Sequence, residues 1–240
     1  MHRIGLALLA STMFVGAASA ADIPRRAPIY KAPVMVTAQP YNWTGFYVGG
    51  NIGGSWGRQD NDVGGVPIGT NNVNGIIGGG QIGYNWQVNQ IVFGLEADFQ
   101  GSGQSGDGSF TTPPGVAAGT TYTFSNKLDW FGTVRGRVGY AFDRWLPYLT
   151  GGWAYGHGSL TGTATGAVTG AGSTSADYSG WTVGGGVEYA FLNNWSAKLE
   201  YLYVDFGDGP SVTLAPSGAV LSAGHLTDNI VRVGLNYKFY

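Results

Sequence analysis

The sequence contains no cysteine and few charged residues. The absence of cysteine excludes a disulfide framework, a thiolate metal site and a cysteine nucleophile. Charged residues make up 11% of the chain, well below the typical quarter, and the formal net charge is −2. Because no excess of basic residues is available to contact phosphates, we expect no nucleic-acid partner.

A hydrophobic run long enough for a membrane-spanning helix is also missing. The apolar stretch from Ile4 to about Val15 is too short, because a helix needs roughly 20 residues to cross a bilayer. A basic start precedes this stretch and the small residues "ASA" follow it, which is typical of a secretory signal peptide. We therefore expect residues 1–20 to be a signal peptide, cleaved between Ala20 and Ala21.

Glycine and alternating patterns are what the sequence has instead. Glycine accounts for 43 of 240 residues, against a usual share of about 7%. Apolar residues repeatedly alternate with polar ones, as Val231 and Val233 do with Arg232, and this alternation predicts β-strands. We expect eight strands, near residues 43–56, 73–86, 90–100, 124–142, 145–157, 177–191, 195–206 and 226–239.

The predicted strands are joined by connections of two kinds. Three are short, such as Asp143-Arg144, and the other four are long and rich in Gly, Ser, Thr and Asn. Short turns at one end and long loops at the other are typical of an up-and-down barrel in an outer membrane. The fold class is therefore predicted to be all-β, an eight-stranded antiparallel transmembrane β-barrel over residues 41–240. The proline-rich residues 21–40 are expected to form a periplasmic linker.

Aromatic residues close every second predicted strand. The endings "GYNW", "GYAF", "EYAF" and "NYKF" recur about 50 residues apart, which could also indicate propeller blades, but each period holds only two strands. In a barrel these rings would form a girdle at the periplasmic membrane interface. The predicted girdle consists of Tyr84, Trp86, Tyr140, Phe142, Tyr189, Phe191, Tyr237 and Phe239.

Charged residues identify the inward face of the barrel. Arg135 and Arg137 are two residues apart and share a face, and on the lipid side each would cost roughly 2–4 kcal/mol. We therefore expect a charge network that closes the lumen, because an eight-stranded barrel is only wide enough for its own side chains. The alternative is a soluble ligand-carrying barrel, in which the apolar face points inward and the charged face points outward. Such a barrel would not explain the repeated aromatic endings. The predicted network consists of Glu96, Asp98, Asp129, Arg135, Arg137, Glu188, Lys198, Glu200 and Arg232, with Lys238 on the same face.

Four segments carry a resemblance to a known family: "YNWTGFYVGGNIGGSWG", "PYLTGGWAYG", "WSAKLEYLYVDFG" and "VRVGLNYKF". The sequence resembles the small outer-membrane β-barrel proteins of alpha-proteobacteria, the outer membrane immunogenic or opacity-type porin group. The resemblance implies an eight-stranded barrel in the cell outer membrane, surface antigenicity and a part in envelope integrity. Some members of the family are described as porins or as haemin binders.

Two histidines raise the possibility of other chemistry. His157 and His225 fall near the long-loop end, close in sequence to Ser159 and Asp228, as a lipid-modifying enzyme would require. Haem ligation by these histidines, or by the loop tyrosines Tyr122 or Tyr178, is a further alternative. Because no motif brings such groups together, we expect no catalysis, no metal and no cofactor.

The sequence thus predicts a monomeric structural barrel that supports the envelope and presents polar, mobile loops. Its alternatives are a small-solute porin and a haemin-binding surface receptor. The expected partners are outer-membrane lipid and lipopolysaccharide, together with the barrel-assembly machinery. That machinery would contact the C-terminal strand and read Phe239, which is in phase with the outward residues, rather than Tyr240.

Overall fold

The computed structural model describes residues 40–112 and 119–239. The predicted signal peptide, its cleavage site at Ala20–Ala21 and the linker up to residue 39 lie outside these residues, as does Tyr240. The described residues contain no helix long and apolar enough to cross a membrane.

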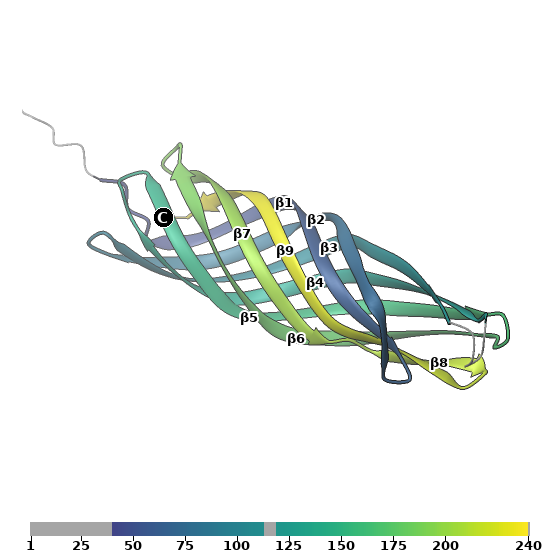
Figure 1. The fold of residues 1–240 in the computed structure, drawn as a ribbon. Coiled ribbons are helices and arrows are strands. Elements are labelled where there is room, and N and C mark those ends of the chain that lie inside the picture. Colours follow the sequence, from purple (N-terminus) through teal and green to yellow (C-terminus); the bar gives the residue numbers. More distant parts are fainter. Residues whose placement is uncertain (1–39, 113–118, 240) are drawn as a thin grey trace, which may run out of the picture. The chain divides into compact units, whose positions relative to one another are not determined.

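Nine antiparallel strands make up the described chain, and eight of them form a closed ring (Figure 1). Each strand of the ring pairs with its neighbour in sequence, and the ring closes where the first strand pairs with the last. The short eighth strand lies outside this ring order and pairs with the last strand and with the sixth. The eight-stranded antiparallel barrel is therefore confirmed. The strands are β1 (Gly45–Val63), β2 (Val66–Val88), β3 (Ile91–Thr111), β4 (Thr121–Tyr140), β5 (Trp145–Thr165), β6 (Gly170–Ala190), β7 (Trp195–Asp208), β8 (Ser211–Pro216) and β9 (Ala219–Lys238).

Short turns join the strands at one end of the barrel. Asn89 and Asp143 lie in two of these turns with φ angles of 55° and 54°. This left-handed conformation is one that Asn and Asp tolerate better than most residues, and it suits tight hairpins. The end that holds these turns is called here the short-turn end, and the opposite end the long end.

The strands reach much further toward the long end than the sequence predicts. Both Gly/Ser/Thr-rich segments, 101–120 and 158–177, are predicted to be loop, but residues 101–111 continue β3, residues 158–165 continue β5 and residues 170–177 begin β6. The prediction of loops over these strand residues is wrong, because alternate positions in residues 101–111 and 158–165 face the barrel interior. Leu160 and Gln104, for example, are 1% and 4% exposed. Such residues are buried when the extended strands remain closed in a ring.

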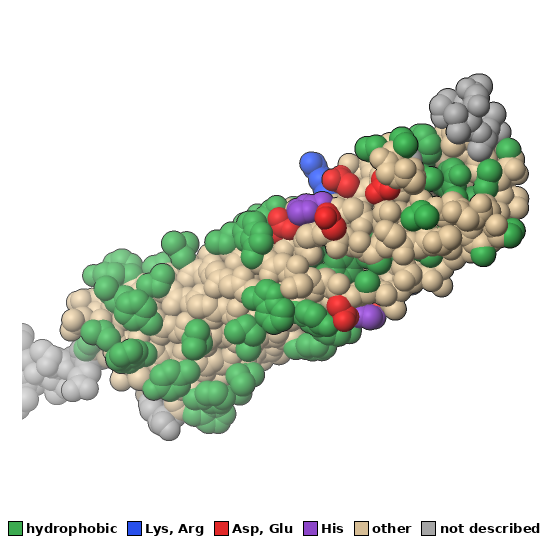
Figure 2. Space-filling view, turned by 90° about the horizontal axis from the view of Figure 1, so that it is seen from below, with side chains coloured by type: hydrophobic (Ala, Val, Ile, Leu, Met, Phe, Trp, Pro, Cys, Tyr) green, Lys and Arg blue, Asp and Glu red, His purple; other side chains and the backbone are tan. Residues whose placement is uncertain are grey.

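Side chains alternate between the barrel interior and the outer surface. On β9, Arg232 is 1% exposed, whereas its neighbours Val231 and Val233 are 38% and 53% exposed. Figure 2 shows the result on one face, where hydrophobic side chains gather over one part of the barrel and charged side chains lie beyond its edge. The interior is therefore polar at positions where the outer surface is apolar, as a membrane barrel requires.

Three apolar clusters occupy the interior in addition to charged groups. The mouth cluster, at the short-turn end, contains Trp43, Val92, Ala141, Leu146 and Ala190. The middle cluster includes Ile77, Phe131, Tyr178, Leu202, Phe206 and Ile230. The upper cluster, toward the long end, includes Tyr122, Phe124, Leu160, Val212, Leu214 and Leu221. Charged residues lie between the mouth and middle clusters, because the buried Arg135 and Arg137 lie in sequence between Phe131 of the middle cluster and Ala141 of the mouth cluster.

Candidate functional site

Eight ionisable side chains come together inside the barrel, and we call them the ionic cluster. They come from β3, β4, β6, β7 and β9, and each residue is at most 7% exposed. Four are acidic and four are basic, so their formal charges cancel. The members are Glu96, Asp98, Arg135, Arg137, Glu188, Lys198, Glu200 and Arg232.

Arg135 contacts three carboxylates of the ionic cluster. Its Nη2 lies 2.5 Å from Glu96 Oε1 and 2.9 Å from Asp98 Oδ2, and its Nη1 lies 3.1 Å from Glu200 Oε1. Its Nε donates to Thr133 Oγ1 at 2.9 Å. One guanidinium therefore joins β3 and β7 across the interior from its place on β4.

Arg232 and Lys198 complete the pairing of the same carboxylates. Arg232 Nη2 lies 2.9 Å from Asp98 Oδ2 and 2.6 Å from Glu200 Oε2. Lys198 Nζ lies 2.8 Å from Glu96 Oε1. Such mutual pairing is what makes buried charges tolerable, because an unpaired charge in a dry interior is very costly.

Arg137 lies nearer the short-turn end and joins the cluster through Glu188, at 2.9 Å between Nη2 and Oε2. Its guanidinium carbon lies 5.2 Å and 4.8 Å from the ring centres of Tyr47 and Tyr148, a cation–π arrangement. Gly94 is its register partner on β3, and a Cβ there would lie 2.8 Å from Arg137 Cγ. A larger residue at position 94 would therefore displace the side chain of Arg137 or of Asn85.

Asp129 was predicted in the lumen network but is exposed on the outer surface. The register of β4 against β5 shifts between Leu128 and Trp130, which is a β-bulge. The extra residue changes the phase, so that Leu128 and Phe131 both point inward. The lumen assignment of Asp129 is therefore wrong, and two-residue periodicity could not have shown the bulge.

The interior at the short-turn end is closed by Trp43, which is 2% exposed. Its indole Nε1 donates to the Asp143 carbonyl at 3.0 Å, and its backbone N donates to Gln87 Oε1 at 2.7 Å. The inward Lys238 is also buried, and its Nζ donates to the Asn42 carbonyl. The sequence showed Trp43 only as an aromatic near a strand start, and its inward direction was missed.

The predicted periplasmic girdle lies on the outer surface near the short-turn end. Seven of its eight residues are at least 37% exposed, and Tyr237 is half-buried against Trp195 and Phe239, both 5.1 Å away between ring centres. The recurring aromatic endings in the sequence lie at the ends of β2, β4, β6 and β9. They do not reveal the outward aromatics at the starts of β1, β3, β5 and β7, which are Phe46, Phe93, Trp145 and Trp195.

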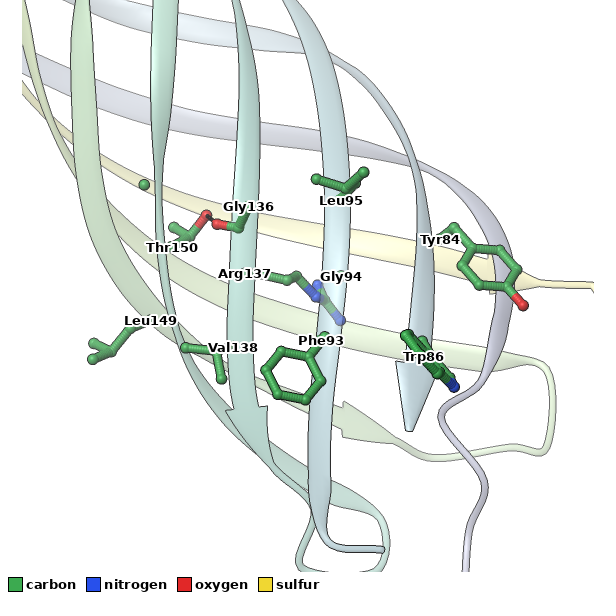
Figure 3. A pocket seen from close by; sticks show the side chains of 11 residues that line it. Tyr84, Trp86, Phe93, Gly94, Leu95, Gly136, Arg137, Val138, Leu149 and Thr150 are labelled. Atoms are coloured by element: carbon green, nitrogen blue, oxygen red, sulfur yellow. Dashed lines mark hydrogen bonds between the residues drawn. The ribbon is translucent and has the colours of Figure 1, made fainter. Parts of the chain in front are cut away.

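An apolar groove of about 710 Å³ crosses the outer surface between β2 and β5 (Figure 3). Trp86, Phe93 and Leu149 are among the side chains that line it, and Gly136 and Gly151 leave space between them. The groove belongs to the surface that hydrocarbon covers in a membrane barrel. Its size comes from the missing side chains of outward glycines.

The two histidines lie on the outer surface, on β5 and β9. His157 Nδ1 lies 2.8 Å from Asp177 Oδ1, and its ring stacks on Trp130. His225 Nε2 lies 3.1 Å from Asp205 Oδ1. Asp228, by contrast, is buried inside, so it does not meet His225.

Neither of the two candidate haem-ligating tyrosines lies in a loop. Tyr122 and Tyr178 lie in β4 and β6 and are buried inside the barrel. Within the described ranges, no group of three His, Cys, Asp or Glu side chains could hold a metal ion.

The closed antiparallel ring with an apolar outer band and a charged interior defines a transmembrane β-barrel. A family model described as "Outer membrane protein beta-barrel domain" matches residues 7–239. The 31 kDa outer-membrane immunogenic protein of Brucella melitensis is 38% identical, over the full length of both chains. The 22 kDa outer membrane protein of Rhizobium leguminosarum is 34% identical, over 82% of this chain and 79% of its own.

The chain therefore belongs to the outer membrane protein β-barrel family and is a protein of the cell outer membrane. The outer membrane protease OmpT of Escherichia coli is similar in fold, with a TM-score of 0.50 and 12% identity, over 85% of this chain and 99% of that one. At this identity the likeness concerns the fold alone. The two sequence relatives are named as outer-membrane or immunogenic proteins and not as enzymes.

Proposed function

We propose that this protein is a non-catalytic structural barrel and surface antigen that supports the outer membrane, with an interior closed to ions. The observation that carries the proposal is the ionic cluster, in which four acids and four bases are buried and mutually paired. A conducting lumen would need a continuous water-filled path past these groups. Opening such a path would separate paired charges, and breaking a buried pair costs about 3–5 kcal/mol.

The apolar clusters support the same proposal from either side of the ionic cluster. Trp43 covers the short-turn end, while Phe131 and Leu214, both fully buried, belong to the clusters toward the long end. Ions cross apolar constrictions poorly because these constrictions exclude water. A closed barrel can still stabilise the envelope, since its work depends on its outer surface and its long end.

The test of closure is conductance of the refolded protein in a planar lipid bilayer. We expect no steady open-channel current. A steady current like that of a wide porin would overturn the closed interior and favour the small-solute porin instead. Migration that differs between boiled and unboiled samples in detergent shows that the refolded barrel is intact.

Support of the envelope is a separate part of the proposal and has its own test. Cells that lack the protein should become more sensitive to detergent, and the wild-type chain should restore resistance. Unchanged sensitivity would contradict a role in envelope integrity. We further propose that the barrel works as a monomer among outer-membrane lipid and lipopolysaccharide.

We also propose that the assembly machinery contacts β9 and reads Phe239. Phe239 is 44% exposed, its backbone N donates to the Phe46 carbonyl at 2.8 Å, and its ring faces outward with that of Phe46, 5.8 Å away. Phe239→Ala should therefore reduce the amount of assembled barrel in cells. Normal assembly of Phe239→Ala, combined with failed assembly after deletion of Tyr240, would contradict the proposal.

A further inference from the structure

The outer surface changes from apolar to polar at one level on three neighbouring strands. On β1 the outward residues pass from Ile52 and Trp56 to Arg58. On β2 the change falls between Ile76 and Asn74. On β9 it falls between Val231 and Asn229. Asn74 and Asn229 are both paired with Trp56, so the three strands place the boundary of the hydrocarbon layer within one row of side chains of one another.

A polar hollow of about 430 Å³ lies at this boundary. The register of the strands arranges its side chains in two rows of three. Trp56 is paired with Asn74 on one side and Asn229 on the other, and Arg58 is paired with Asn72 and Thr227. Directly opposite residues have Cβ atoms about 4.5–5.5 Å apart, so six side chains surround one small volume.

Three of these side chains have unused hydrogen-bonding capacity. Arg58 is exposed, and within the described part of the chain its guanidinium makes no hydrogen bond or ion pair. The amides of Asn72 and Asn74 are likewise exposed and make no side-chain hydrogen bond to described residues. Asn229 is held in place instead, because it accepts from Tyr201 Oη at 2.7 Å. The carboxylate of Asp60, the next outward residue on β1, accepts from Thr70 Oγ1 at 3.0 Å.

We propose that this hollow binds the anionic sugar headgroup of an outer-leaflet lipid. An arginine guanidinium binds phosphate or carboxylate groups through two parallel hydrogen bonds. The free amides of Asn72 and Asn74 can bond to sugar hydroxyls, since each amide offers both donors and an acceptor. Trp56 offers a flat apolar ring at the depth where amphipathic rings are favoured. The acyl chains of the same lipid would lie along the apolar band directly below.

The proposal names a site for the lipopolysaccharide partner that was expected above, and it rests only on the location in the outer membrane. It does not depend on a closed lumen. A conducting barrel could still bind the headgroup, and a closed barrel could fail to do so, so the two proposals are tested separately.

The experiment measures retention of lipid A by the refolded full chain in native mass spectrometry. The probes are bisphosphorylated lipid A, the same lipid without phosphates, and inorganic phosphate. We expect wild-type protein to bind the phosphorylated lipid about tenfold more tightly than the dephosphorylated one, the scale of one charge-assisted contact. Arg58→Ala should lose about tenfold for the phosphorylated lipid alone. Asn72→Ala with Asn74→Ala should weaken both lipids.

The matched control is Lys127→Ala, which removes another exposed outward cation, on β4. Its binding should equal that of wild type. Equal loss in Lys127→Ala and Arg58→Ala would overturn the site in favour of general charge attraction. Wild-type binding by Arg58→Ala, or full displacement of the lipid by inorganic phosphate, would also overturn the proposal.

Discussion

The ionic cluster and the upper cluster fill the same barrel with opposite chemistry. The ionic cluster lies nearer the short-turn end and is held by ion pairs such as Arg135–Asp98, at 2.9 Å. The upper cluster is held by apolar contact among residues such as Leu160, Leu214 and Leu221, each at most 1% exposed. Both clusters are buried, but ion pairing stabilises the first and apolar packing stabilises the second.

The difference concerns what a single substitution leaves behind. Removal of one partner from the ionic cluster leaves an uncompensated buried charge. The free-energy cost of that charge does not depend on whether the neighbouring side chains can fill the vacated volume. Removal of a side chain from the upper cluster leaves a cavity, whose cost depends on how far the neighbours can relax. The ionic cluster should therefore be the less tolerant of the two.

Arg135→Met should have the largest effect on stability. It leaves Glu96, Asp98 and Glu200 short of a common partner, and we expect a loss of about 3–5 kcal/mol in the free energy of unfolding. The measurement is urea-induced unfolding in lipid vesicles. The control is Arg58→Ala, which removes an exposed arginine and should stay within about 0.5 kcal/mol of wild type. Equal effects of the two variants would refute a paired interior.

Leu160→Ala tests the upper cluster by the same measurement. Leu160 is 1% exposed, and truncation of a buried leucine costs about 2–5 kcal/mol. Thr161→Ala is the matched control, because Thr161 is the next residue on β5 and is exposed. A loss near zero for Leu160→Ala would show that the long end contributes no packed core.

Val233→Arg places on the outer face a charged side chain of the kind found in the interior. Arg232 and Val233 are adjacent, but the first is 1% and the second 53% exposed. An arginine facing lipid near the bilayer midplane should cost about 2–4 kcal/mol of unfolding free energy. If Val233→Arg unfolds at the wild-type urea concentration in vesicles, position 233 does not face hydrocarbon.

His225 should give the smallest effect, since its side chain is 47% exposed. Partial burial lowers its pKa, but the hydrogen bonds and charges of Asp205 and Asp208 raise the pKa more, so that it lies above its ordinary value. Protonated His225 therefore stabilises the folded state. This contribution to the free energy of unfolding is fully present below the ordinary pKa of histidine and is lost as the pH rises through the raised pKa. It should amount to less than about 1 kcal/mol.

The measurement for His225 is an NMR pH titration of its ring. Asp205→Asn should move the pKa down toward the ordinary value. Asp107→Asn, which changes an exposed aspartate on β3, should leave it in place. A pKa that is unaffected by Asp205→Asn would refute the pairing.

The position of the ionic cluster can be predicted largely from sequence. Charged residues in alternation with apolar ones can point only inward in a membrane strand, so eight of the nine network positions could be placed together. Asp129 was misplaced because its bulge shifts the register by one residue, and no local pattern shows such a shift.

The upper cluster was missed because its composition resembles that of loops. Leu160 and Ala164 are separated by Thr, Gly and Thr. Clusters of such small polar residues are typical of loops, although threonine also fits an extended strand. The inward course of Trp43 was missed for a related reason, since its contacts with Asp143 and Gln87 join residues far apart in sequence. Closure of the barrel by contacts between residues far apart in sequence, rather than local strand preference, determines the position of the upper cluster and the direction of Trp43.

Adjacent residues of one strand face paired charges on one side and lipid on the other. Because the chain has no native cysteine, Thr133→Cys and Val134→Cys each carry a unique thiol. Thr133 is 3% and Val134 is 56% exposed. A lipid-soluble nitroxide maleimide should label position 134 in vesicles and report contact with acyl chains, while position 133 stays unlabelled. Labelling of position 133 with protection of position 134 would contradict the account.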